Sequence, residues 1–425
     1  MNDSIWVEQQ VVNYKKLNKN ISVDVLVVGG GICGVLCAYY LKKRNVNVVL
    51  VEKNQIGHGI TKNTTAVLSS QQQILYKNRV EKVGFNSAKK YYEAHQEAIK
   101  EFKKLSENFE FDFEENMSFI YSKRGDDSLK KEYELLKRMG IETLYTSKNY
   151  ESLGFYNQAQ INPFKLIKEL CQEIKYYENT EIIDINDNIA YTPNYCIKAN
   201  KIVICTHFPF FKFKGGFSFK MYQMKSYVVA IKTSKIMRDS YVELKEGGFY
   251  FRRYKDMMLI GSNDQKTGCM TETYANIMRL IVKVFPDYKI IKKWSNQDCI
   301  TLDDMPYIGK YRGKNEYYVA TGFNMWGMTS SMISAQIISD LIVNGKSKYA
   351  ELFDPYRKTY KKQLFSNVKN ALKNLLKFNG KRCTHLGCSL TFNKEENVYE
   401  CPCHGSKFTA DGLVIYNPAK KNIKK

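Results

Sequence analysis

A glycine-rich turn between two apolar runs is the feature that most limits how this chain can fold. The run Val23–Val28 precedes Gly29-Gly30-Gly31-Ile32-Cys33-Gly34, and a helical pattern then continues to about residue 44. A second apolar run, residues 46–51, ends at Glu52. This order of strand, glycine turn, helix, strand and acid is typical of a parallel βαβ unit that binds a dinucleotide.

Each glycine of the turn has its own expected role. Gly29 permits the tight turn, Gly31 lets the backbone approach a pyrophosphate, and Gly34 lets helix and strand pack closely. The N-terminus of the helix offers free N–H groups and a positive dipole end to the phosphates. Glu52 is placed to accept hydrogen bonds from the ribose hydroxyls. A purely structural glycine turn is the alternative interpretation.

The composition describes a folded, basic protein. A chain of 425 residues, 44% hydrophobic and 25% charged, is long enough for two or three domains and ordinary for a soluble globular protein. The formal net charge of +22 raises the question of RNA, DNA or an anionic electron carrier. Because the basic residues are interleaved with acidic and apolar ones, we favour a solvated basic surface over a nucleic-acid partner.

The sequence also predicts the cellular location. The first twenty residues lack the apolar core of a signal peptide. The apolar segment 23–41 contains Asp24 and three consecutive glycines, an arrangement that no lipid-exposed helix needs. Cysteines before residue 380 stand apart in apolar segments and are expected to be buried and reduced. We therefore expect a cytoplasmic protein without membrane association.

Further motifs continue the pattern over residues 20–345. They are the loop Thr64-Thr65-Ala66, Asn162-Pro163-Phe164, residues 178–182, the run 201–205 with Thr206-His207, residues 301–309, the run 317–320 with Thr321-Gly322, and Trp326-Gly327-Met328-Thr329 before a helix. Together and in this order they resemble the glycine oxidase/D-amino-acid oxidase superfamily. The resemblance implies an α/β fold with FAD as cofactor. It implies a Rossmann-like FAD-binding domain (20–84, 156–215 and 299–345) and an antiparallel-sheet substrate domain (85–155 and 216–298).

The resemblance also implies which residues contact FAD. They are Gly29, Gly31, Gly34, Glu52, Lys53, Thr64, Thr65, Ala66, Ile182, Thr206, Gly322, Gly327, Met328 and Thr329. The isoalloxazine is expected near 327–329, where the dipole of the following helix would stabilise negative charge at N1/C2=O. Core packing is the alternative for Trp326 and Met328. No second glycine fingerprint for NAD follows.

The residues that bind substrate are harder to identify from the sequence. Segment 216–298 contains strand-like runs, and in the resembled family an Arg on such a strand holds the substrate carboxylate. Arg252 or Arg253 could fill that role, because Arg offers a planar bidentate fork. Neighbours on a strand face opposite sides, so at most one of them points inward, and a solvent-facing ion pair is the alternative. For His207 we favour packing or capping over a role at the cofactor.

Cysteine and histidine gather at the end of the chain. Cys383-Thr-His385-Leu-Gly-Cys388 and Cys401-Pro-Cys403-His404-Gly-Ser406 hold two of the 5 histidines and four of the 11 cysteines. Two Cys and two His suit zinc, but zinc leaves two cysteines unexplained, and a disulfide-only hairpin is a further alternative. The two stretches resemble the two Rieske boxes. The resemblance implies a [2Fe–2S] cluster held by Cys383, His385, Cys401 and His404, with a disulfide between Cys388 and Cys403.

Two features set this tail apart from a full Rieske domain. Asp354-Pro355 and the apolar spacing behind it predict a connecting helix over 354–379, which leaves only 380–425 for a truncated Rieske subdomain. Without a supporting base sheet, the subdomain is expected to rest on the flavoprotein or on a partner. Phe408 stands where high-potential Rieske proteins carry Tyr, whereas Ser406 is retained, which predicts the lower part of the roughly −150 to +300 mV Rieske range.

The combination resembles Rieske-containing FAD-dependent oxidoreductases of the glycine/D-amino-acid oxidase (deaminating) type. It implies oxidation of a small-molecule amine or amino acid by hydride transfer to FAD. Single electrons would then pass through the cluster to or from an external one-electron carrier, for which the positive charge favours an acidic protein. Two alternatives stay open at this stage: oxidation of a modified tRNA base, and a non-catalytic redox sensor.

Overall fold

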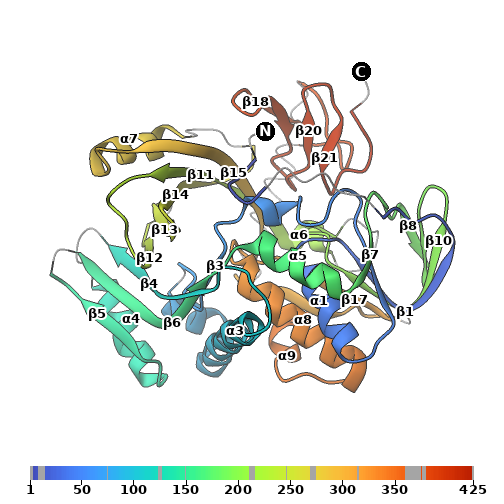
Figure 1. Cartoon of the computed structure of the whole chain (residues 1–425), viewed down its shortest axis with the longest axis horizontal. Helices are drawn as coiled ribbons and strands as arrows, with labels where there is room; N and C mark the ends of the chain where they lie inside the picture. The colour runs from blue at the N-terminus through green and yellow to red at the C-terminus, as the bar shows by residue number, and fades with distance from the viewer. Residues whose placement is uncertain are drawn as a thin grey trace.

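The computed structural model describes residues 3–7, 15–73, 75–122, 127–148, 150–209, 216–245, 247–268, 274–313, 315–358, 375 and 380–423. In these residues the strands form three sheets, flanked by helices (Figure 1). The predicted α/β class, with a parallel nucleotide-binding sheet, an antiparallel sheet and a small C-terminal module, is confirmed.

The first sheet, called here the parallel sheet, has the strand order β16-β17-β10-β1-β2-β7, and the hairpin β8–β9 extends it beside β10. Its inner strands pair in parallel, and β2 is fully buried, as expected for a sheet covered on both faces. The strands are β1 (Ile21–Val28), β2 (Val48–Val51), β7 (Lys175–Tyr177), β8 (Asp184–Asn186), β9 (Ile189–Tyr191), β10 (Cys196–Ile204), β16 (Tyr307–Lys310) and β17 (Tyr317–Thr321). Helices α1 (Ile32–Lys43), α5 (Pro163–Glu173) and α8 (Gly327–Asn344) pack together with it.

The second sheet, called here the large sheet, has the order β15-β11-β14-β13-β12-β4-β6-β3, with β5 beside β6. Its strands are β3 (Val67–Leu68), β4 (Glu114–Ser122), β5 (Thr143–Thr146), β6 (Glu151–Gln160), β11 (Met221–Lys232), β12 (Ser240–Glu243), β13 (Tyr250–Tyr254), β14 (Met257–Lys266) and β15 (Lys289–Thr301). The predicted boundaries placed β3 and the end of β6 in the FAD-binding domain. In the structure both belong to the large sheet. The boundaries themselves stay a prediction.

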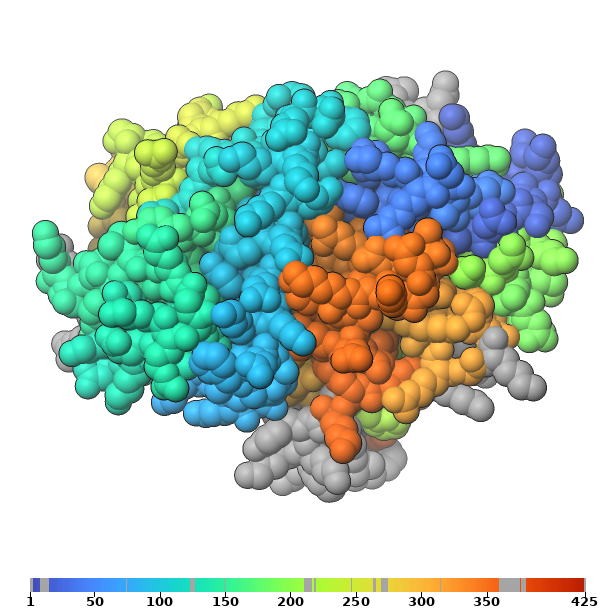
Figure 2. Space-filling model, turned by 90° about the horizontal axis from the view of Figure 1, so that it is seen from below, coloured from blue at the N-terminus to red at the C-terminus, as the bar shows by residue number. Residues whose placement is uncertain are grey.

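A 3₁₀ turn and further helices lie outside the sheets. They are the 3₁₀ turn η1 (Ile60–Asn63) and the helices α2 (Tyr76–Val83), α3 (Phe85–Ser106), α4 (Ser128–Arg138), α6 (Phe217–Lys220), α7 (Ala275–Val284) and α9 (Ala350–Phe353). Figure 2 shows the face where α3 lies beside the α8–α9 segment. Among the described residues, no helix combines the length and apolar character that crossing a bilayer requires.

Residues 380–423 form the C-terminal module, a meander of four short antiparallel strands. These are β18 (Thr391–Asn393), β19 (Val398–Glu400), β20 (Lys407–Thr409) and β21 (Val414–Tyr416). Figure 1 shows the module beside β11 and β15, on the side of the molecule opposite α3, α8 and α9. Its contacts to β11 and β15 confirm the prediction that the truncated subdomain rests on the rest of the chain.

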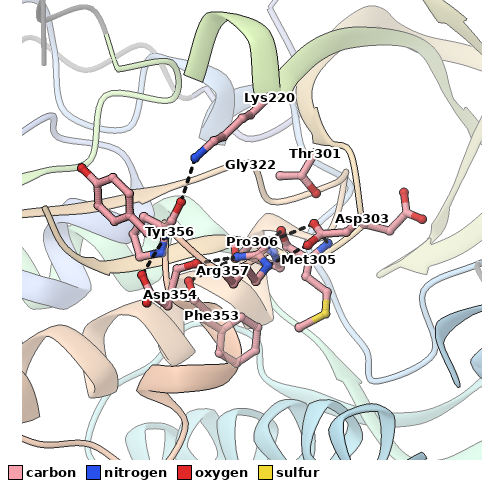
Figure 3. Close-up of polar contacts among 12 residues, drawn as sticks. Lys220, Thr301, Asp303, Met305, Pro306, Gly322, Phe353, Asp354, Tyr356 and Arg357 are labelled. Atoms are coloured by element: carbon pink, nitrogen blue, oxygen red, sulfur yellow. Dashed lines mark hydrogen bonds and ion pairs between the residues drawn. The ribbon is translucent and has the colours of Figure 1, made fainter. Parts of the chain in front are cut away.

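Arg357 anchors the segment that leads toward the module. Its Nε and Nη2 donate to the two carboxylate oxygens of Asp303, both at 2.7 Å, and Nη1 donates to the Pro306 carbonyl at 2.8 Å (Figure 3). The Arg357 and Asp303 side chains are only 11% and 5% exposed, so water screens this bidentate pair little. The anchor fixes the chain where it leaves α9.

The start of the predicted connecting helix is wrong. Residues 354–358 form turns, because the Asp354 carboxylate accepts from Tyr356 N–H at 2.8 Å while Arg357 folds back onto the 303–306 loop. Apart from Leu375, residues 359–379 of the predicted helix lie outside the described residues.

A buried group of four charges joins the module to the large sheet. Lys225 of β11 pairs at 2.5 Å with both Glu396 and Glu400 of the module, and Lys407 pairs with Glu396. All four side chains are at most 8% exposed. Burial alone would raise the pKa of Glu396, but the Lys407 and Lys225 ammonium groups lower it to about 2. Glu396 is therefore ionised at physiological pH, as a partner of two lysines must be.

We expect Lys225→Met to lower the free energy of unfolding by about 3–5 kcal/mol, because it leaves two buried carboxylates with one lysine. The matched control is Lys232→Met, at the last residue of β11. Lys232 pairs with Asp256 on the surface. Urea unfolding should show a large shift of the midpoint for Lys225→Met and almost none for Lys232→Met. Equal midpoints for the two variants would contradict a supporting role for the buried group.

Candidate cofactor sites

The glycine turn has the geometry that the sequence predicts. Gly29 has φ of +107°, and a Cβ there would lie 2.6 Å from the Cys205 carbonyl oxygen. A Cβ on Gly34 would lie 1.9 Å from the Gly29 carbonyl oxygen, so α1 could not pack this closely on the turn with any other residue. A Cβ on Gly31 would meet only Thr61 Oγ1, at 3.3 Å, so the backbone on this side is open to a ligand.

A cavity of about 530 Å³ runs from this turn to the N-terminus of α8. Ten of the fourteen residues predicted to contact FAD line it: Gly29, Gly31, Glu52, Lys53, Thr64, Ile182, Thr206, Gly322, Gly327 and Met328. His207, for which packing was favoured, lines it too. A cavity bounded by a phosphate-binding turn at one end and a helix N-terminus at the other fits an extended dinucleotide.

The other four predicted contacts lie elsewhere. Gly34 packs beneath the turn, and Thr65 lines a second, smaller cavity. Ala66 and Thr329 are buried, and the Thr329 hydroxyl points to the Ser69 carbonyl at 3.4 Å. Neither of them lines either of the two cavities, so their predicted contact with FAD has no support from this geometry.

Glu52 is fixed at the edge of the large cavity. Its carboxylate accepts hydrogen bonds from Gly30 N–H at 2.8 Å and Asn54 N–H at 2.9 Å. Burial raises the pKa of Glu52, while these two backbone bonds act against that shift. The acid is therefore oriented by the same turn that carries Gly29 and Gly31.

The turn before α8 is held in an unusual backbone conformation. Asn324 and Met325 have φ of 52° and 70°, in the left-handed region that side chains other than Gly seldom adopt. The Asn324 side chain accepts from Thr301 N–H at 2.8 Å and donates to the Gly322 carbonyl at 2.9 Å. These bonds fix the turn directly before Gly327 and Met328, the first residues of α8, which line the cavity. Trp326, for which core packing was the alternative, is half-buried and lines the smaller cavity.

The smaller cavity, about 70 Å³, lies between the large sheet and the start of α8. It shares with the larger cavity the lining residues Thr64, Asn296, Asp298, Met325, Gly327 and Met328, so the two adjoin. Arg252 lines it from β13 and is 1% exposed. Its Nε donates to Gln160 at 2.9 Å and its Nη2 to the Ile161 carbonyl at 2.8 Å. Among the described residues, Nη1 of Arg252 has no hydrogen-bond partner.

Arg253 lies on the opposite face of β13. It is paired with Glu114 in a half-exposed ion pair and does not line the smaller cavity. The alternation of side chains along a strand explains the difference between the two neighbours. A clamp role for Arg253 is therefore wrong, and the solvent-facing alternative describes it.

The two Cys/His stretches fold into the same turn. Cys383 N–H donates to the Cys388 carbonyl and Gly387 N–H to the Cys383 carbonyl, both at 2.9 Å. Cys401 repeats the pattern with Ser406 and Gly405 at the same distances. Gly387 and Gly405 have φ of 79° and 73°, which explains a glycine at the same place in each box. Two equivalent loops thus present two pairs of side chains to one site.

The side chains of these loops suit a mixed sulfur and nitrogen ligand set. A hydrogen bond with Cys401 lowers the pKa of Cys383 to about 6, despite burial. The His385 and His404 rings lie 5.1 Å apart. Nδ1 of His385 is buried without a hydrogen-bond partner among the described residues. Cys388 and Cys403 form a disulfide, which leaves Cys383, His385, Cys401 and His404 to hold a cluster.

The module and the large cavity are in contact. The His404 ring lies 6.0 Å from the Phe208 ring, between centroids, and Phe208 follows the cavity residues Thr206 and His207. Gln223 donates to the His404 carbonyl at 2.8 Å, and Gln297 donates to the Gly405 carbonyl at 2.7 Å. The sequence gives no sign of these contacts, because polar residues on β11 and β15 carry no local signal of what they bind.

Two protein-family models match the chain. The model described as FAD dependent oxidoreductase matches residues 24–341, and the model described as Rieske [2Fe-2S] domain matches residues 357–425. FAD and a Rieske [2Fe–2S] cluster are therefore the cofactors, and the zinc and disulfide-only alternatives are set aside.

Similar sequences are found both for the chain as a whole and for its Rieske part. YhfW of Bacillus subtilis (strain 168), described as a Rieske 2Fe-2S iron-sulfur protein, is 30% identical over 483 aligned positions, covering 97% of this chain and 95% of the relative. The cytochrome b6-f complex iron-sulfur subunit of Synechococcus sp. (strain JA-3-3Ab) is 51% identical over 41 residues, 10% of this chain and 24% of that subunit.

Solved structures share the fold of the larger part. Glycine oxidase from Geobacillus kaustophilus superposes with a TM-score of 0.68 at 18% identity, covering 80% of this chain and all of that one. L-amino acid deaminase from Proteus vulgaris gives 0.67 at 17% identity, covering 82% and 97%. The chain therefore belongs to the FAD dependent oxidoreductase family and carries a C-terminal Rieske [2Fe–2S] domain, and its larger part shares the fold of these solved structures.

Proposed function

We propose that this oxidoreductase oxidises a small amine or amino acid at the FAD and exchanges the electrons singly, through the Rieske cluster, with an external carrier. The observation that carries the substrate assignment is Arg252, a buried guanidinium whose Nη1 has no partner in the described part of the chain, in a cavity that adjoins the one predicted to hold FAD. A buried cation without an anionic partner favours an anionic ligand.

Arg252 would hold the substrate carboxylate. Burial lowers the pKa of its guanidinium. Electrostatic attraction to Tyr254 and Asp112 acts against that shift. Gln160 and the Ile161 carbonyl fix the other nitrogens, so Nη1 is oriented before substrate arrives. A carboxylate in the smaller cavity would restore the missing countercharge and gain a charge-assisted hydrogen bond.

Asn296 and Asp298 would receive the amino group. Both line the two cavities where they adjoin, and Asn296 Nδ2 donates to Asp298 Oδ2 at 2.7 Å. The Asp298 carboxylate is 8% exposed, so it attracts an ammonium more strongly than a surface carboxylate would. Bound FAD supplies the two-electron acceptor for the C–H hydride. Arg252 and Asp298 would thus orient a zwitterion toward it and keep water out.

The two cluster histidines would differ in function. His404 is 4% exposed and faces Phe208 next to the FAD cavity. His385 is half-buried, and its neighbour Leu386 is 50% exposed. His404 would therefore mediate exchange with FAD, and His385 would face the external carrier.

A screen of amines and amino acids for anaerobic bleaching of the FAD absorbance tests the substrate assignment. We expect bleaching by compounds that carry a carboxylate, and Arg252→Lys should raise KM for them by about 10- to 100-fold, since the Nη1 donor that Gln160 and Ile161 orient is lost. Arg253→Lys is the matched control, because it changes the same residue type one position along β13 on the other face. A similar KM in both variants would argue against the clamp.

The reduction potential of the cluster tests the role of position 408. Phe408 is fully buried among the four module cysteines and offers no hydroxyl. We expect Phe408→Tyr to raise the potential and Ser406→Ala to lower it, because hydrogen bonds to the cluster raise Rieske potentials. An EPR-monitored redox titration measures both. A wild-type potential near the top of the Rieske range would show that this reasoning fails.

A further inference from the structure

The end of the Rieske domain faces two cofactor sites at once. The segment 414–422, called here the C-terminal loop, follows the second cluster box and lies partly against it. Ser406 Oγ accepts from Ala419 N–H at 3.0 Å, and Thr384 Oγ1 donates to the Lys421 carbonyl at 2.5 Å. One side of the loop is thereby fixed to both cluster loops.

The other side of the C-terminal loop forms part of the wall of the FAD cavity. Seven of its residues line that cavity: Val414, Ile415, Tyr416, Asn417, Ala419, Lys420 and Asn422. The glycine turn and Glu52, which belong to the parallel-sheet side, line the same cavity. The dinucleotide fingerprint places the ADP part of FAD along that turn and acid.

Two polar side chains attach the loop to the nucleotide-binding side. Asn417 Nδ2 donates to the carbonyls of Thr206 and Phe208, at 2.9 and 2.6 Å. Lys420 Nζ donates to the Ile183 carbonyl at 3.2 Å, next to the cavity residue Ile182. The loop therefore spans the cavity from the end of β10 to the 182–183 segment.

We propose that the C-terminal loop is a part of the FAD-binding site, which closes the cavity over the ADP portion and couples retention of FAD to an intact Rieske domain. FAD could leave only after Asn417 and Lys420 release their carbonyls, so these residues should set the rate of FAD loss. The proposal depends on FAD binding alone and not on the substrate proposed above.

The test uses the purified full-length holoprotein and two loop variants. Asn417→Asp keeps the side-chain shape but removes the donor and brings a carboxylate against two carbonyl oxygens. Lys420→Met removes the exposed ammonium that donates to the Ile183 carbonyl. Lys394→Met is the matched control, because Lys394 is an exposed lysine in the β18–β19 turn of the same module, outside the cavity lining.

FAD release after dilution is followed by the fluorescence of free FAD, and cluster content by iron and sulfide analysis and EPR. We expect release at least about tenfold faster in Asn417→Asp, the effect of losing one or two hydrogen bonds, and a smaller increase in Lys420→Met. The control should release FAD at the wild-type rate. If Asn417→Asp loses its cluster or does not fold, Lys420→Met decides. Wild-type release rates in a loop variant that keeps its cluster would overturn the proposal.

Discussion

Two glutamine amides of the large sheet hold the second cluster loop, and the position of the iron–sulfur site relative to FAD depends on that contact. Gln223 and Gln297 are almost fully buried and donate to the carbonyls of His404 and Gly405. A Cβ on Gly405 would lie 2.5 Å from Gln223 Cδ, so the glycine that shapes the turn also permits the docking. Buried donors and acceptors that satisfy one another are costly to separate, which favours a fixed module.

In this fixed position the two cluster histidines have different surroundings. The His404 ring contacts Phe208, whereas His385 is half-buried beside Leu386, which is 50% exposed. The same docking brings the C-terminal loop onto the FAD cavity. Residues 206–208 and the C-terminal loop thus lie between the cavity predicted to hold FAD and the cluster loops, which is the arrangement that the proposed converter between two-electron and one-electron transfer would need.

The local motifs were predictable from the sequence, whereas the contacts between domains were not. The glycine turn and the two cluster boxes are short, and each glycine is required by a backbone angle or a close approach within its own motif. For Arg252 and Arg253 the sequence predicts that at most one points inward, and only the folded position of β13 shows that it is Arg252. The bonds from Gln223, Gln297 and Lys225 span 181, 108 and 175 residues. Contacts between residues this far apart in the sequence leave no periodic pattern in it. Strand β15, which carries Gln297, was not predicted as a strand.

The most direct measurement is flash photoreduction of the FAD in the anaerobic holoprotein, with the cluster followed by absorbance and EPR. The account predicts that the cluster is reduced as the flavin is reoxidised, in a first-order step whose rate does not change with protein concentration. A rate proportional to protein concentration, or a cluster that stays oxidised beside reduced flavin, would contradict electron transfer within one chain.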